Sequence, residues 1–186
     1  QITTDHDLNQ QFDPLPSAYD IPYQPVWERM GIQVFRYLDE REFGLVLSQG
    51  CIYECTFCSA QKGQKETFRS LSAFRTDLLY LLNQAKFFGI LQLECYASSL
   101  DFFQQPKVVF EYLEAMVEAQ KETRVRRRTR CLTCMNTFLA ASRQRQDFPE
   151  LIRESGLWCL GFGVDGPTEE VWQEQHKDQN RMSDVE

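Results

Sequence analysis

The sequence contains only two histidines and no long hydrophobic run. No apolar stretch approaches the roughly 20 residues that a helix needs to cross a bilayer, and the N-terminus lacks the basic and apolar parts of a secretory leader. The net charge of −7 argues against a general binder of nucleic acid or of membrane surfaces. We therefore expect no membrane partner and no nucleic-acid partner.

The composition otherwise fits a globular protein with a real core. The chain has 186 residues, of which 42% are hydrophobic and 13% aromatic, and this length is enough to bury a core. The seven cysteines are an odd number, and three of them share the spacing of metal ligands. This usage indicates a reducing compartment, so we expect a cytoplasmic protein.

These three cysteines, Cys51, Cys55 and Cys58, follow the apolar run 43–47 in the pattern C-x-x-x-C-x-x-C. Thiolates suit zinc, copper(I) or iron with sulfide. A structural zinc site normally needs four protein ligands, yet the next cysteine is Cys95 and both histidines are far away in sequence. Three cysteines therefore favour a cluster with one open metal corner. The alternatives are a zinc-binding interaction module and a chance group of buried thiols.

The motif resembles the C-x-x-x-C-x-aromatic-C signature of the radical S-adenosylmethionine (radical SAM) superfamily, with Phe57 in the aromatic place. The resemblance implies that Cys51, Cys55 and Cys58 bind three irons of a [4Fe-4S] cluster and that S-adenosylmethionine binds the fourth. It also implies an electron donor such as a flavodoxin or ferredoxin, formation of a 5′-deoxyadenosyl radical, and a substrate that the motif does not identify. A non-catalytic iron–sulfur electron carrier, with four protein ligands, is a further alternative.

Two domains are expected. Residues 1–40 are interpreted as a Pro-rich linker or N-terminal arm, and residues 41–186 as the radical SAM core. The segment Phe12–Asp20 resembles the link to a cobalamin-binding domain in one branch of the superfamily, which implies cobalamin bound by an upstream domain, although the composition alone indicates only a linker. Ser183–Glu186 matches a capping box that opens a helix, so we expect a core truncated at the C-terminus.

Strands and helices are predicted to alternate in the core. The sequence predicts strands at 43–50, 90–96, 129–135 and 157–164, and helices at about 70–88 and 106–120, at 147–156, and from Pro167 onward. This order predicts an α/β fold with a parallel sheet and right-handed crossovers. The resemblance implies that these are the first four units of a partial TIM-like (β/α) barrel.

Ligands gather at the carboxyl ends of parallel strands. Near the end of the second strand, Glu94, or a backbone carbonyl with Ser98 behind it, is the candidate for holding the ammonium of S-adenosylmethionine. The sequence lacks the Gly-Gly-Glu motif that many family members have there. Glu94 facing solvent or pairing with an arginine is an equally open interpretation.

Asn136, at the expected end of the third strand, is the candidate for the ribose or carboxylate of the cofactor. The fourth strand end, GFGVDG, resembles the Gly-Ile-Glu-Ser strand end of the family, with Asp165 in the place of the acid. Gly161 and Gly163 would let the backbone approach a ligand, or only ease packing.

Two further patterns are interpreted as structural. Cys131 and Cys134 form C-x-x-C, but positions three apart on a strand point to opposite faces, which weakens the case for a second cluster or redox pair. The basic run 121–130 would suit RNA phosphates. It has no interleaved aromatic residues for base stacking, so a solvated connection is preferred.

Overall fold

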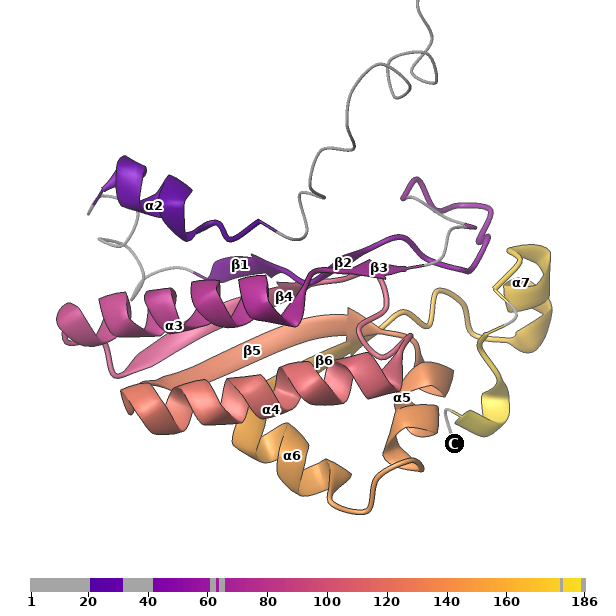
Figure 1. The fold of residues 1–186 in the computed structure, drawn as a ribbon. Helices are drawn as coiled ribbons and strands as arrows, with labels where there is room; N and C mark the ends of the chain where they lie inside the picture. Colours follow the sequence, from indigo (N-terminus) through magenta and orange to yellow (C-terminus); the bar gives the residue numbers. More distant parts are fainter. Residues whose placement is uncertain (1–20, 32–41, 61–62, 64–65, 178, 185–186) are drawn as a thin grey trace, which may run out of the picture.

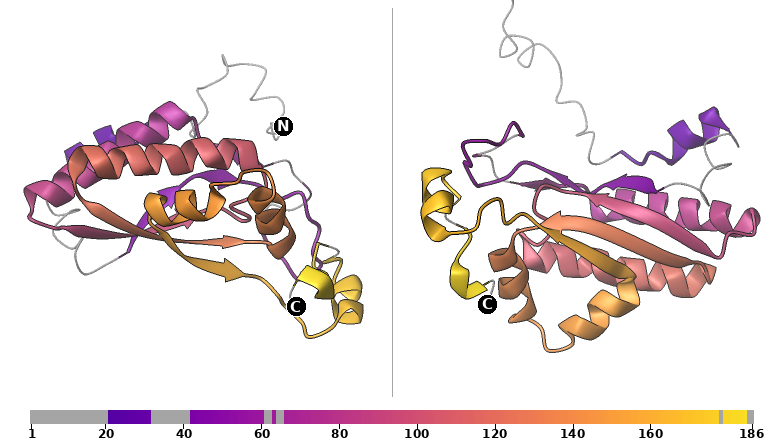
Figure 2. Two further views of the ribbon diagram at one scale, coloured as in Figure 1. Left: turned by 90° about the horizontal axis from the view of Figure 1, so that it is seen from below. Right: turned by 180° about the vertical axis from the view of Figure 1, so that it is seen from behind.

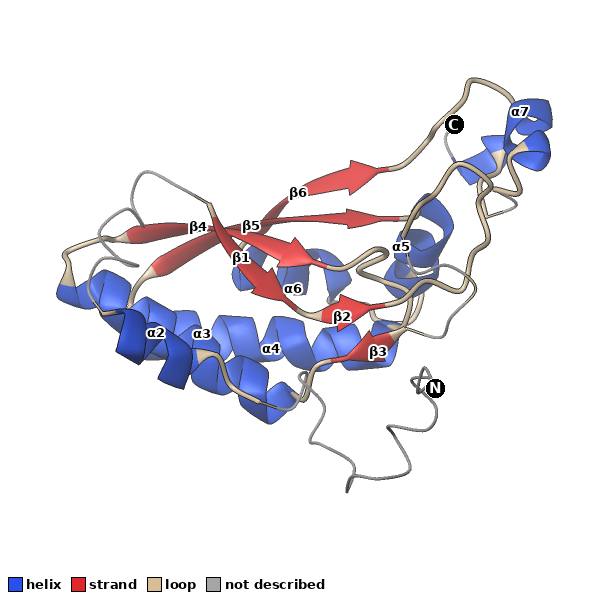
Figure 3. Ribbon diagram, turned by 90° about the horizontal axis from the view of Figure 1, so that it is seen from above, coloured by secondary structure: helices blue, strands red, loops and turns tan. Residues whose placement is uncertain are grey.

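The computed structural model describes residues 21–31, 42–60, 63, 66–177 and 179–184. Their centre is a sheet of four parallel strands in the order β1-β4-β5-β6, with the long helices on one face (Figures 1 and 3). The strands are β1 (Phe43–Val46), β4 (Gln92–Ser98), β5 (Arg126–Thr133) and β6 (Leu157–Phe162). This arrangement confirms the predicted α/β fold and parallel sheet; among the described residues the sheet stays open.

Helices follow the strands along the chain, with a short antiparallel ribbon, β2 (Ser48–Gln49) and β3 (Thr67–Phe68), beside the sheet. The helices are α2 (Gln24–Met30), α3 (Leu71–Phe87), α4 (Pro106–Thr123), α5 (Met135–Ser142), α6 (Phe148–Ser155), α7 (Glu169–Glu174) and the 3₁₀ turn η2 (Met182–Asp184). Figure 2 shows α7 and the C-terminal segment beyond the end of the sheet. None of the helices described is long and apolar enough to span a membrane.

The two long helices form where the apolar period predicted them. Ser70 caps α3 by accepting a hydrogen bond from the backbone N–H of Ala73 at 3.3 Å, and Pro106 occupies the first turn of α4. Their apolar faces are buried against the sheet and each other, as predicted. The buried apolar residues include Phe74, Leu78, Leu81, Leu82, Ala85, Val109, Tyr112, Leu113, Met116 and Val117.

The third strand differs from the prediction. β5 begins at Arg126, three residues earlier than expected, so much of the basic run 121–130 is strand and the interpretation as a solvated connection was wrong. Alternate side chains of β5 are buried, Arg127 among them, while Arg126 and Arg130 are exposed. Apolar periodicity cannot detect such a strand, because arginines occupy both of its faces. Two helices, α5 and α6, then follow β5 where the sequence predicted one.

Part of the range interpreted as a linker is helical and packed. Trp27 of α2 lies edge-on to Phe43, with ring centroids 5.2 Å apart, and stacks on Tyr80 of α3 at 6.3 Å. The Asp77 carboxylate of α3 also accepts hydrogen bonds from the backbone N–H groups of Tyr23 and Gln24, at 2.9 and 2.8 Å. Residues 1–20, which contain the segment Phe12–Asp20 expected to lead to a cobalamin-binding domain, and residues 32–41 lie outside the described residues.

Candidate functional site

The loop that carries Cys51, Cys55 and Cys58 lies beyond the carboxyl end of β1, as predicted, but the expected strand 43–50 is divided into β1 and β2, and the loop follows β2. The β2–β3 ribbon closes the base of the loop. Gly50 opens the loop at φ +95°, in the region where a side chain would be strained. The loop lies at the edge of the sheet where β4 and β5 also end (Figure 1), which is where parallel sheets usually bind ligands.

The three thiols differ in exposure and in their partners. Cys55 is only 8% exposed, whereas Cys51 and Cys58 are half-buried. The amide Nε2 of Gln179 lies 3.4 Å from the Cys55 sulfur, and that of Gln104 lies 3.9 Å from the Cys51 sulfur. Amide donors next to sulfur favour the charged thiolate. Burial raises the pKa of the free Cys51 thiol, so loss of that proton would need compensation by a bound cation or metal.

A segment after α7 packs against the cysteine loop. The backbone carbonyl of Gln175 accepts a hydrogen bond from the Thr56 N–H at 2.9 Å and one from its hydroxyl at 3.3 Å. His176 follows at φ +51°, and Gln179 then reaches Cys55. These residues lie about 120 positions from the motif in sequence, and no spacing pattern pointed to them.

A cavity of about 460 Å³ opens beside the loop, at the carboxyl ends of β1, β4 and β5. Its lining residues are Val46, Ser48, Gln49, Ala60, Tyr96, Ser98, Ser99, Leu100 and Leu132. Ala60 comes two residues after Cys58, so the cysteine loop forms part of the wall. Ser98 ends β4 and lines this cavity, which confirms its predicted place at the strand end. Volumes of this order hold small-molecule ligands.

The structure corrects the position of Glu94. This residue is the third of β4 and not near the strand end, so it lies away from the cysteine edge. Its carboxylate pairs with Arg128 at 3.4 Å and accepts a hydrogen bond from Gln92 at 3.0 Å. The alternative interpretation of Glu94, pairing with an arginine, is therefore confirmed. The error came from ending the strand two residues early.

Asn136 also has a different place from the predicted one. It lies in the first turn of α5 and not at a strand end. Its amide donates to the Tyr53 hydroxyl of the cysteine loop at 3.2 Å. Asn136 and Tyr53 line a second cavity of about 450 Å³ together with Ile52, Glu54, His176 and Gln179. Asn136 therefore contacts the cysteine loop from the start of a helix and not from the end of a strand.

Asp165 and Gly163 are connected to the motif through Lys177. Asp165 forms an ion pair with Lys177, whose side chain is 6% exposed. The Lys177 ammonium in turn lies 5.4 Å from the ring centroid of Phe57, which is itself half-exposed. A Cβ on Gly163 would come within 3.1 Å of the Asp165 carboxylate. Glycine therefore makes room for the ion pair at this strand end.

The C-x-x-C pair is divided between two elements. Cys131 is buried in β5, whereas Cys134 precedes α5 and its N–H donates to Asp101 at 3.0 Å. Burial, with the negative charges of Asp101 and Cys51 nearby, raises the pKa of the Cys134 thiol. The strand-alternation argument therefore does not apply to Cys134, because this residue is outside the strand. Cys134 is a cysteine that the fold brings near the motif.

A buried carboxylate supports the cavity wall, and sequence reasoning missed it. Glu66 is 2% exposed and accepts hydrogen bonds from Ser48 and, at 2.9 Å, from Ser99, both of which line the cavity. Its second oxygen has no hydrogen-bond partner in the described part of the chain. Burial raises the pKa of Glu66 to about 7, and the charge of Asp101 adds to the rise. No motif marks Glu66, since its burial results from tertiary contacts.

We expect this carboxyl group to make stability depend on pH. The folded-state pKa of about 7 exceeds the ordinary 4.5, so folding favours the protonated form. Its stabilising contribution is complete below pH 4.5 and is lost as the pH rises through 7. The free energy of unfolding should fall by about 2–3 kcal/mol across this range, measured by urea denaturation. Glu66→Gln should remove most of this fall in the free energy of unfolding. An unchanged pH dependence in this variant would contradict the raised pKa of Glu66. Glu111→Gln, at an exposed position of α4, is the control.

The described residues contain no group of three His, Cys, Asp or Glu side chains that could hold a single metal ion. The three motif cysteines are thus not arranged as a mononuclear site. In comparisons with known proteins, no family model matches the sequence, and no match is found among curated proteins or solved structures.

Proposed function

We propose that this chain is the core of a radical SAM enzyme and that its four parallel strands belong to a partial TIM-like barrel. The observation that carries the proposal is the position of the C-x-x-x-C-x-F-C loop. It lies beyond the carboxyl end of β1 and forms part of the wall of a cavity of about 460 Å³. Motif, strand edge and cavity thus occur together where parallel α/β folds bind ligands.

The donor set fits a cluster better than a single ion. A zinc ion needs its ligand atoms together at about 2.0–2.3 Å from one centre, and the described side chains offer no such group. In a [4Fe-4S] cluster each cysteine binds a different iron, so Cys51, Cys55 and Cys58 need not converge on one point. Gln104 and Gln179 place amide N–H groups beside two of the three sulfurs, and hydrogen bonds to sulfur tune such clusters.

The chain would bind and orient the cofactors. When bound, the cluster and S-adenosylmethionine supply one-electron cleavage of a carbon–sulfur bond, which gives methionine and a 5′-deoxyadenosyl radical. Ser98 and the neighbouring hydroxyl groups of the cavity offer hydrogen bonds to the methionine ammonium. The segment after α7 covers one side of the loop and limits the access of water to Cys55. Electrons would come from a flavodoxin or ferredoxin, and an upstream domain would bind cobalamin.

A non-catalytic electron carrier is the second candidate, because one observation favours it. Such a carrier needs a fourth protein ligand, and Cys134 directly follows β5 at the edge of the sheet that carries the cysteine loop, two residues before Asn136, which contacts Tyr53 of that loop. The two candidates differ in the fourth corner of the cluster. The radical SAM proposal leaves this corner to S-adenosylmethionine, whereas the carrier fills it with a thiolate.

The ligand at the fourth corner of the cluster can be tested by reconstitution and spectroscopy. We expect anaerobic reconstitution to load about four irons per chain, and added S-adenosylmethionine to change the electron paramagnetic resonance spectrum of the reduced cluster. Cys134→Ser should leave both results unchanged. Loss of the cluster in Cys134→Ser, together with a spectrum insensitive to S-adenosylmethionine, would instead establish the carrier. Zinc without iron in the purified chain would favour the interaction module.

A further inference from the structure

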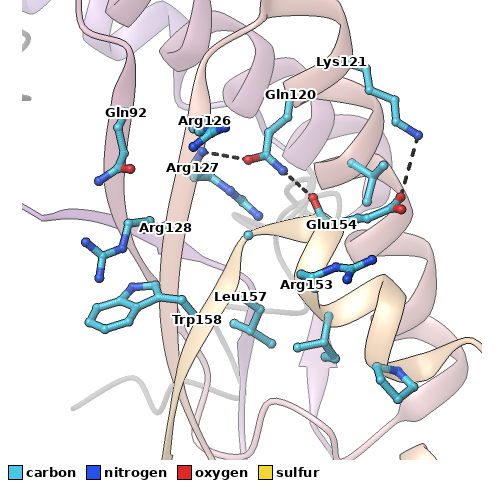
Figure 4. A pocket seen from close by; sticks show the side chains of 14 residues that line it. Gln92, Gln120, Lys121, Arg126, Arg127, Arg128, Arg153, Glu154, Leu157 and Trp158 are labelled. Carbon is cyan, nitrogen blue, oxygen red and sulfur yellow. Dashed lines mark hydrogen bonds and ion pairs between the residues drawn. The ribbon is translucent and has the colours of Figure 1, made fainter.

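A larger cavity, of about 890 Å³, lies at the other end of the sheet, where β5 and β6 begin (Figure 4). Helices α4 and α6 form its second wall. β5 spans roughly 25 Å, from eight residues at about 3.3 Å each, and it separates this cavity from the cysteine loop. The cavity therefore has no part in the site proposed above.

The wall of this cavity is strongly basic. It contains one carboxylate, Glu154, and five cationic side chains, which are Lys121, Arg126, Arg127, Arg128 and Arg153. Lys121 lies 3.9 Å from Glu154, and Arg128 pairs with Glu94 at 3.4 Å. Within the ranges that the structure describes, the side chains of Arg126 and Arg153 have no ion-pair partner. In a chain with net charge −7, this is a local concentration of positive charge.

Arg127 is a buried cation behind this wall. The residue is 2% exposed and donates one hydrogen bond, from Nη2 to the Ser155 carbonyl at 2.9 Å. Its Nε and Nη1 have no partner in the described part of the chain. Burial lowers the pKa of Arg127 to about 10, so it stays charged at neutral pH. A buried charge without a counterion is costly, and an anion in the cavity would offset that cost.

Gly156 brings α6 and β6 close to this arginine. It has φ +77°, and a Cβ there would lie 2.0 Å from the Arg127 carbonyl oxygen. The Gln120 side chain of α4 joins the backbones of β5 and α6. It accepts a hydrogen bond from the Arg127 N–H at 2.7 Å and donates one to the Glu154 carbonyl at 2.8 Å. These contacts fix the backbone of α4, β5 and α6 around Arg127, whereas the side chains of Arg126 and Arg153 are exposed.

Trp158 adds an aromatic face to the cavity. The β5–β6 pairing shifts from Thr129 with Leu157 to Arg130 with Cys159, which leaves Trp158 as the unpaired residue of a bulge. Its side chain is 54% exposed, and the Arg128 guanidinium lies 3.8 Å from its ring centroid. The basic run 121–130 contains no aromatic residue of its own, and Trp158 comes from the neighbouring strand β6.

We propose that this cavity binds a nucleotide, with its phosphate on the basic wall, to which Arg126 and Arg153 contribute from the two faces of the sheet, and its base on the ring of Trp158. Guanidinium groups match phosphate geometry in bidentate pairs, and bases stack on exposed aromatic rings. Cavities of about 300–1,000 Å³ are typical for small ligands. The acidic net charge of the chain disfavours a long polyanion, so the ligand is a free nucleotide and not a stretch of RNA.

The test is titration of the whole chain with AMP, GMP, inorganic phosphate and a short single-stranded RNA. Binding is measured by calorimetry and by tryptophan fluorescence. We expect AMP or GMP to bind, and Arg126→Gln with Arg153→Gln to weaken binding at least about tenfold. Trp158→Leu should weaken nucleotide binding but not phosphate binding. Arg124→Gln removes a charge from the same basic run outside the cavity and should change neither.

The outcomes separate the sources of the nucleotide. RNA that binds no tighter than the mononucleotide supports the free ligand, whereas much tighter RNA binding, with a steep salt dependence, overturns that choice in favour of a strand. Absence of binding by all four probes at millimolar concentration overturns the site. Equal weakening by Arg124→Gln also overturns it, because binding would then depend on overall charge. Circular dichroism and melting of each variant verify that the fold is retained.

Discussion

Replacing Cys51, Cys55 or Cys58 with alanine is expected to abolish the proposed [4Fe-4S] cluster. Anaerobic reconstitution should yield about four irons and four sulfides in the unchanged chain and close to none in each variant, measured by iron and sulfide analysis and by visible absorption. The effect should be complete because each of the three cysteines is expected to bind a different iron. With one thiolate removed, two corners would lack protein ligands.

Cys159→Ala is the matched control. Cys159 is also partly buried, but it lies in β6, so its loss should leave the iron content unchanged. The Cys51 and Cys58 variants should fold like the parent, since these residues are half-buried and belong to no long element, and circular dichroism checks the variant at the buried Cys55. Intact cluster absorption in the triple variant would contradict the proposed function. Loss of iron in Cys159→Ala as well would point to nonspecific thiol binding.

Local patterns predicted the layout of the sheet and its helices. The apolar periods of α3 and α4, the cap at Ser70 and the proline at Pro106 are local features of single elements, so the sequence alone predicts them. The start of β5 was missed, because Arg126 and Arg127 break the apolar run that marks a buried strand. The ends of β4 and β5 were also placed wrongly, by two residues each. That small error was enough to misplace Glu94 and Asn136.

The partners of the cysteine loop could not be predicted in the same way. Gln104 and Gln179 reach the thiols from distant segments, and Lys177 joins Asp165 to Phe57 across more than 100 residues of chain. Glutamine and lysine carry no signature for such roles. Their function depends on tertiary placement alone, as does the burial that raises the pKa of Glu66. The motif therefore identified the chemistry, and the fold supplied its surroundings.

Asp77 of α3 forms a buried ion pair with Arg69, and both side chains are 0% exposed. Arg69 also donates to the Ile21 carbonyl at 2.9 Å, and its guanidinium lies 4.2 Å from the Tyr23 ring centroid. Asp77 in turn accepts the backbone N–H groups that precede and begin α2. One carboxylate thus neutralises a buried cation and fixes α2 to α3.

Asp77→Ala is expected to lower the free energy of unfolding by about 3–5 kcal/mol, because it leaves the Arg69 guanidinium buried without a counterion. Urea denaturation measures the loss. Glu118→Ala, which breaks the exposed Arg75–Glu118 pair of 2.9 Å, should cost under about 1 kcal/mol. The double replacement Arg69→Met with Asp77→Leu should be less destabilising than Asp77→Ala, since no unpaired charge remains. A loss in Asp77→Ala no larger than that in Glu118→Ala would show that Arg69 finds another partner or reaches water.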